Sequence, residues 1–179
     1  WAMVQLQLFT GMRPGEVVTM RRGEIDTSGK VWLYRPVSHK TEHHGHERRV
    51  YLGPQAQKVL MRFLNRADDA YLFSPIDAEQ ERRARQHAAR KTPLSCGNRP
   101  GTNRRTNPKR SLGEAYDVGS YRRAILRGCA KAAPWPKLKG RKLSELSQQE
   151  RKERDIWRNA HRWHPHQLRH NAATFLRKE

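Results

Sequence analysis

The stretch Leu8–Met20, with the sequence LFTGMRPGEVVTM, determines how the N-terminal part of the chain folds. Before the stretch and at its start, large apolar side chains occur at near-helical spacing, namely Trp1, Val4, Leu8 and Phe9. Gly11 stands where a helix would end in a left-handed cap, and Pro14 suits the first turn of a helix. Glu16 complements the positive end of that second helix. The stretch therefore predicts a helix, a tight turn and a second short helix that begins around Arg13.

Two β-rich runs follow, at Val31–Tyr34 and Arg49–Leu52, and a polar segment from about Ser38 to Glu47 separates them. This pattern predicts a β-hairpin with a long tip. Gly53-Pro54 then opens a helix with a core-facing stripe, formed by Ala56, Val59, Leu60, Phe63 and Leu64. We therefore expect a small antiparallel sheet in the N-terminal part of a mainly helical α+β fold.

Charge and helical patterns alternate in the second half of the chain. Residues 79–110 contain ten Lys and Arg against two Glu, which predicts an extended basic loop. A further helix, ending near Pro134, is indicated by Tyr121, Ala124, Ile125 and Cys129. The charged stretch 137–160 contains a capping box at Ser147-x-x-Glu150. Pro165–Leu176 predicts a buried helix whose first turn carries His166 and Arg169 on one face, where an anion is favoured.

The composition predicts one domain with a polyanionic partner. A chain of 179 residues is long enough for one core, but the hydrophobic fraction of 35% and the mean hydropathy of −1.02 leave much polar surface. Lys and Arg total 37 against 17 Asp and Glu, a formal net charge of +20, so nucleic acid is the first partner to expect. Ribosomal proteins and cationic membrane binders share such a charge, which by itself indicates only affinity for phosphate.

Several negative signals narrow the class of protein. No run of about 18 apolar residues and no signal-peptide pattern occurs, so we expect a cytoplasmic, nucleoid-associated protein without a membrane partner. The start at Trp1 indicates a fragment. Cys96 and Cys129 lack metal or disulfide spacing and are expected to be ordinary thiols. We expect no cofactor and no metal site, although four histidines gather in the hairpin tip: His39, His43, His44 and His46.

Metal-free transfer of a DNA phosphodiester to a protein hydroxyl has defined requirements. It needs cationic donors around the non-bridging oxygens, a proton for the leaving 5′-oxygen and a nucleophile in line. Arginine suits the first role because its planar fork gives two parallel hydrogen bonds to phosphate. Two arginines, a histidine and a lysine supply all of these groups except the nucleophile.

The stretch Leu8–Met20 resembles the first box of the tyrosine recombinases, also called phage-type integrases. Arg13 matches the first catalytic arginine of that family, and Glu16 matches the acidic residue that helps to fix its active-site geometry. The hairpin tip His39-Lys40-Thr41 is similar to the segment that carries the catalytic lysine. The resemblance therefore implies Lys40 as the general acid.

The segment Pro165-His166-Gln167-Leu168-Arg169-His170 resembles the HxLRH box of the same family. It implies His166 and Arg169 as the second catalytic pair, while His170 contacts the phosphate or an acidic neighbour, or packs in the core. The resemblance covers about residues 1–76 and 115–179. It implies a partial catalytic domain over 1–179, with a basic insertion at about 79–110 and a charged insertion at about 137–160.

Two departures from the family pattern bear on activity. The family's nucleophilic tyrosine follows the HxLRH box, but all five tyrosines here precede it: Tyr34, Tyr51, Tyr71, Tyr116 and Tyr121. The family's N-terminal core-binding domain has no counterpart in the sequence. We therefore expect the whole enzyme to be a site-specific DNA recombinase that self-associates on double-stranded DNA and forms a 3′-phosphotyrosine intermediate, and this chain to bind DNA without cutting it.

Two other classes stay open on the sequence. The chain could be a non-catalytic DNA-binding module. It could also be part of a type IB topoisomerase, an enzyme that shares much of the recombinase active site but relaxes supercoils. The basic segment either lies along the DNA backbone or is an insertion without a defined function. Its candidate DNA-binding residues are Arg82, Arg83, Arg85, Arg104 and Arg105.

Overall fold

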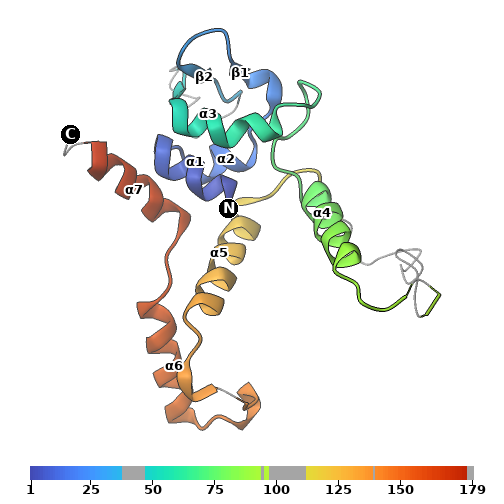
Figure 1. Ribbon diagram of the computed structural model, residues 1–179. Helices are drawn as coiled ribbons and strands as arrows, with labels where there is room; N and C mark the ends of the chain where they lie inside the picture. Colours follow the sequence, from blue (N-terminus) through green and yellow to red (C-terminus); the bar gives the residue numbers. More distant parts are fainter. Residues whose placement is uncertain (38–46, 94, 97–111, 139, 177–179) are drawn as a thin grey trace.

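The computed structural model is mainly helical, with one small antiparallel sheet near its N-terminal part (Figure 1). It describes residues 1–37, 47–93, 95–96, 112–138 and 140–176. This architecture confirms the predicted fold class at the level of its helices and sheet. None of the helices in these ranges combines the length and the apolarity needed to cross a membrane.

The first two helices and the turn between them follow the prediction closely. α1 (Ala2–Thr10) ends at Gly11, whose φ of 62° is left-handed and whose N–H donates to the Gln7 carbonyl at 2.9 Å. α2 (Pro14–Val18) follows with Arg13 as its N-cap residue. The turn therefore presents Arg13 at the start of a new helix.

The buried side of α1 only partly coincides with the apolar residues at near-helical spacing. Val4, Leu6 and Gln7 are buried, whereas Leu8 and Phe9 are about two-fifths exposed, at 39% and 42%. The reason is the position of α1 in the fold, because it packs against α3 and α7 as well as α2 and β3. Contacts from several directions move the buried side onto residues that a single apolar stripe does not include.

The sheet consists of β1 (Ile25–Asp26), β2 (Trp32–Tyr34) and β3 (Val50–Leu52), in the order β1-β2-β3 with antiparallel neighbours. The predicted hairpin is thus present as β2 and β3, with Tyr34 opposite Val50. Its tip, including Lys40 and the four histidines, lies outside the described residues.

The helix behind the hairpin and the segment after it complete the core. α3 (Pro54–Leu60) continues into the short 3-10 helix η3 (Met61–Phe63), and its predicted stripe is confirmed because Ala56 and Leu60 are buried. Leu72 N–H donates to the carbonyl of Met20 at 2.9 Å, so the chain returns alongside the end of the second helix.

The predicted basic loop is helical over its first part, where α4 spans Pro75–Ala88. Ser74 caps the helix by accepting a hydrogen bond from the Ile76 N–H. Glu79 then binds Arg82 at 2.7 Å and Arg83 at 2.6 Å one turn later. Each such ion pair stabilises an exposed helix by a few tenths of a kcal/mol. The excess of basic residues, from which a loop was predicted, does not reveal these pairs.

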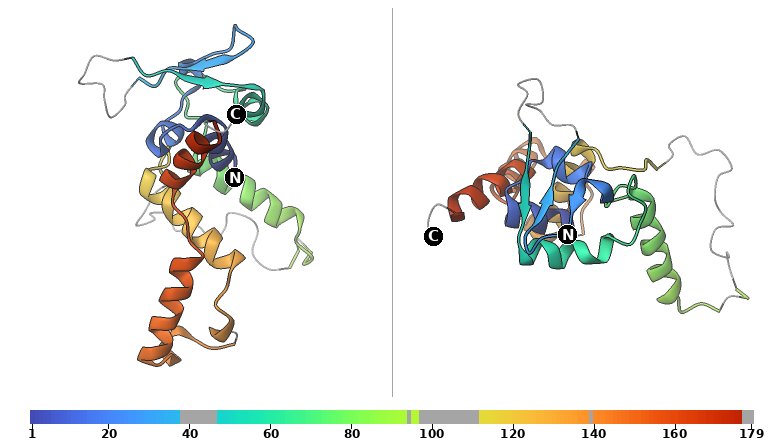
Figure 2. Two further views of the ribbon diagram at one scale, coloured as in Figure 1. Left: turned by 90° about the vertical axis from the view of Figure 1, so that its left-hand side faces the viewer. Right: turned by 90° about the horizontal axis from the view of Figure 1, so that it is seen from above.

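α5 (Val118–Ala132) and α6 (Gln148–Ala160) form an arm that projects from the body of the molecule (Figures 1 and 2). The predicted capping box at Ser147 and Glu150 is confirmed. On α5, Tyr121 and Ile125 are buried and Cys129 packs against the core, whereas Ala124, between the two buried residues, is on the exposed side of the helix. Trp157 donates its indole N–H to the Ala133 carbonyl at 3.1 Å and ties the arm together.

α7 (Pro165–Leu176) lies beside α1 (Figure 1). The helix is half-buried rather than buried, since Leu168 and Ala172 face the core while His166 and His170 are exposed. Its first turn therefore lies close to the turn that carries Arg13.

Substitution of Gly11 by alanine tests the backbone of this turn. A Cβ at Gly11 would meet only Ala172 Cβ, at an ordinary 3.6 Å, so the cost comes from the left-handed φ. We expect Gly11→Ala to lower the free energy of unfolding by about 1 kcal/mol. Gly15→Ala is the matched control, because Gly15 is helical with open space around it and alanine there is expected to be neutral or stabilising. Urea unfolding of both variants decides the point, and a Gly11→Ala protein as stable as the native one contradicts it.

Candidate active site

An open cleft contains Arg13, Glu16 and His166, which come from opposite ends of the sequence. α2 provides one wall and the first turn of α7 contributes His166. Further along, the cleft is lined by Arg21, Glu24, Pro36, Val37, Asp68, Asp69 and Tyr71. The fold thus brings residues of two predicted boxes, the one around Arg13 and the one around His166, to the same cleft.

Arg13 is held at the N-terminus of α2 by Glu16. The Arg13 backbone N–H donates to Glu16 Oε2 at 2.7 Å, and its guanidinium Nη1 donates to Oε1 at 3.0 Å. The hydrogen bonds found for the Arg13 side chain use Nη1 alone within the described part of the chain. Two guanidinium nitrogens are therefore available to an anion in the cleft.

Glu16 is the buried carboxylate of this site, with 4% of its surface exposed. Burial raises its pKa, but hydrogen bonds from Arg48 and from the Arg13 backbone, with the charge of Arg48, outweigh this effect and hold the pKa below its ordinary 4.5. Glu16 therefore stays ionised and can orient cations around it.

Arg169 ties α7 to the turn before Arg13, since its Nη1 donates to the Gly11 carbonyl at 2.7 Å. Burial lowers its pKa, and the neighbouring positive charges of Arg13 and Arg48 lower it further. A guanidinium remains charged at any working pH despite such shifts. Arg13, Arg48 and Arg169 surround the single carboxylate of Glu16 and leave a local positive charge that a phosphate can neutralise. Of the three arginines only Arg13 lines the cleft, whose further part also contains the carboxylates of Glu24, Asp68 and Asp69.

The two histidines of the last box have different positions. His166 lies in the first turn of α7, is exposed and lines the cleft. His170, one turn later, is also exposed, so the option that it packs in the core is wrong. It does not line the cleft.

The buried side chain of Gln7 connects these parts. Its Nε2 donates to the Met12 carbonyl at 3.1 Å and makes a longer contact of 3.5 Å with the Pro165 carbonyl. Its Oε1 accepts a hydrogen bond from the Tyr121 hydroxyl at 2.9 Å. Gln7 thus links the residue before Arg13, the residue before His166 and α5.

A hydrogen bond also connects the sheet to α2. The Tyr34 hydroxyl, fully buried on β2, donates to the Glu16 backbone carbonyl at 2.8 Å. Burial, followed by the nearby carboxylates, raises the pKa of Tyr34, so the hydroxyl keeps its proton. Both ends of Glu16, backbone and side chain, are therefore fixed by groups from the hairpin.

The remaining predicted residues are not placed at the cleft. Lys40, Arg104 and Arg105 lie outside the described residues. Arg82, Arg83 and Arg85 lie on α4, where each has an acidic partner on its own helix. They are solvent-exposed and separate from the cleft.

Two further residues of the site, Arg48 and Gln7, were not predicted from the sequence. A signal for Arg48 existed, because alternation along an extended strand places Arg48 on the same side as Val50 and Leu52, which are buried. Arg49 instead shares the outer side with Tyr51, which is 66% exposed. Gln7 carries no comparable signal, since one polar residue in a helix does not reveal which partners enclose it.

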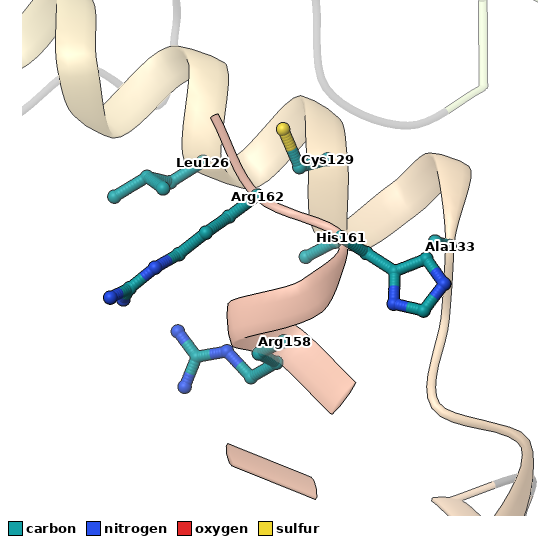
Figure 3. A pocket seen from close by; sticks show the side chains of 7 residues that line it. Leu126, Cys129, Ala133, Arg158, His161 and Arg162 are labelled. Carbon is teal, nitrogen blue, oxygen red and sulfur yellow. The ribbon is translucent and has the colours of Figure 1, made fainter. Parts of the chain in front are cut away.

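A smaller depression lies between α5 and the end of α6, away from the candidate site (Figure 3). Its lining includes Cys129, Arg158, His161 and Arg162. The guanidinium groups of Arg158 and Arg162 extend to one side of it, whereas His161 points to the other and stacks on Trp157 with a centroid separation of 4.0 Å. None of the predicted site residues takes part in it.

Comparison of the chain with protein-family models, curated proteins and solved structures finds no match.

Proposed function

We propose that this chain is the phosphate-binding part of an enzyme of the tyrosine recombinase type, which cuts and rejoins duplex DNA by phosphoryl transfer. The observation that carries the proposal is the meeting of two boxes that are about 150 residues apart in the sequence. Arg13 and His166 line one cleft, and Arg169 binds the carbonyl of Gly11 on the turn that presents Arg13. A chance match of short motifs would not predict that meeting.

The roles follow from the chemistry of each group. Arg13 and Arg169 stabilise the charge that develops on the non-bridging oxygens of the phosphate, each through the guanidinium nitrogens that make no contact among the described residues. His166, at the N-terminus of α7, adds a hydrogen-bond donor beside the helix dipole. Lys40, by the resemblance, protonates the leaving 5′-oxygen.

Double-stranded DNA fits the remaining surface as the partner. The formal charge of +20 supplies affinity for the backbone that does not depend on the catalytic groups. α4 exposes Arg82, Arg83 and Arg85 on a face of its own, separate from the cleft. Binding and chemistry are therefore expected to respond to different substitutions.

A nicked suicide duplex tests the proposal. The protein is produced with the reading frame that contains this chain and whatever follows it, incubated with the duplex and analysed on a denaturing gel. We expect a covalent protein–DNA adduct through a 3′-phosphotyrosine bond. Tight binding of the duplex without any adduct would support a non-catalytic DNA-binding module instead.

A further inference from the structure

Arg48 is the third guanidinium of the site, and its contacts differ from those of Arg13 and Arg169. Its Nε donates to Glu16 Oε1 at 3.0 Å, and its Nη2 contacts Oε2 at 3.4 Å. Both carboxylate oxygens of Glu16 are thus engaged by one planar fork, a geometry that restricts rotation of the carboxylate. Arg13, three residues before Glu16, contacts the same carboxylate through its backbone N–H and its Nη1.

These contacts assign different roles to the two arginines. Arg48 directs two of its three nitrogens at Glu16, whereas Arg13 directs only one. The side chains of both are partly exposed, at 27% and 30%, while that of Glu16 is 3% exposed. Arg13 therefore has more guanidinium nitrogens for hydrogen bonds to an external anion, whereas Arg48 uses most of its nitrogens to hold the Glu16 carboxylate.

We propose that Arg48 is a positioning residue, which fixes Glu16 and through it keeps the Arg13 guanidinium facing the phosphate site. The inference deepens the proposed function and rests on it for the identity of the phosphate. The proposal also gives the hairpin a role in the site, because Arg48, just before β3, then determines the orientation of the N-cap residue of α2.

The charged and titratable groups around Glu16 come from four elements. Arg13 precedes α2, Arg48 precedes β3, Arg169 comes from α7, and Tyr34 of β2 binds the Glu16 backbone. Burial opposes ionisation of Glu16, and Arg48 contributes the largest opposing effect. Removal of Arg48 therefore favours protonation of Glu16 at a higher pH than in the native chain.

The test follows the Glu16 carboxyl by ¹³C NMR titration and the Arg13 Nε–H group by ¹⁵N relaxation, in the chain of 179 residues. In Arg48→Gln we expect the midpoint of the Glu16 titration to rise and the Arg13 side chain to become mobile. Arg48→Lys, which keeps the charge but not the fork, is expected to give an intermediate midpoint, and it serves if the glutamine variant does not fold. Arg49→Gln is the matched control, because Arg49 is adjacent but binds the exposed Glu47.

The proposal is overturned if Arg48→Gln leaves the titration of Glu16 unmoved, if Arg13 stays rigid when that titration moves, or if Arg49→Gln has the same effects. A lysine variant that matches the native chain in both readouts would equally exclude the two-point contact. Inorganic phosphate, added to the native chain, reports on the proposed function separately. Failure of the Arg13 and Arg169 signals to respond to it would contradict the phosphate site, while the titration would still decide the role of Arg48.

Discussion

Replacement of Arg13 or Arg169 by alanine is expected to lower the rate of strand cleavage by about 10²–10³-fold, the usual effect of removing one donor that stabilises charge in a transition state. The affinity for duplex DNA should change little, because many other cations contribute to backbone binding. Rates are measured as covalent adduct on a suicide duplex, with the protein that supplies the tyrosine.

The control for this prediction is Arg85→Ala. Arg85 lies on α4, its side chain is 73% exposed and it does not line the cleft. Its loss removes the same charge without touching the site, so cleavage should stay near the native rate. Near-native adduct formation by Arg13→Ala or Arg169→Ala would refute the assignment of these arginines.

Gln7→Leu is expected to lower the free energy of unfolding by about 2 kcal/mol or more. The substitution introduces an apolar side chain of similar size and leaves the Tyr121 hydroxyl and the Met12 carbonyl without their partners in the core. A buried polar group without a hydrogen bond costs about 1–3 kcal/mol. Urea unfolding, followed by circular dichroism, measures the difference.

Gln5→Leu provides the comparison on the same helix. Gln5 is half-buried, and no hydrogen bond of its side chain occurs within the described ranges. A change within about 0.5 kcal/mol is expected there. Equal effects of the two substitutions would show that Gln7 is an ordinary helix residue and not the link between the two boxes.

The sequence predicted the elements around the site better than the way they pack. The turn at Gly11, the cap at Arg13 and the stripe on α3 depend on local backbone rules, and the structure has them as predicted. The buried side of α1 does not follow from the spacing of its apolar residues, because α1 packs against helices distant in sequence and Leu6 and Gln7 are buried. α4 was predicted as a loop because a net charge does not reveal the pairs of Glu79 with Arg82 and Arg83, which together with the Ser74 cap favour the helix.

The candidate site shows the same division. Arg13, Glu16 and His166 were predicted from motifs, and the structure brings them to one cleft. Arg48 belongs to none of the motifs and was not predicted. Its pairing with Glu16 depends on the register of β3 against β2, which fixes the side of the sheet that each residue faces.

The structure of this chain bound to a DNA duplex tests the central claim most directly. The account predicts that one phosphate accepts hydrogen bonds from both Arg13 and Arg169, with His166 beside it and Glu16 still held between Arg13 and Arg48. A duplex that lies along α4 and leaves the cleft empty, or two arginines on separate phosphates, would contradict it.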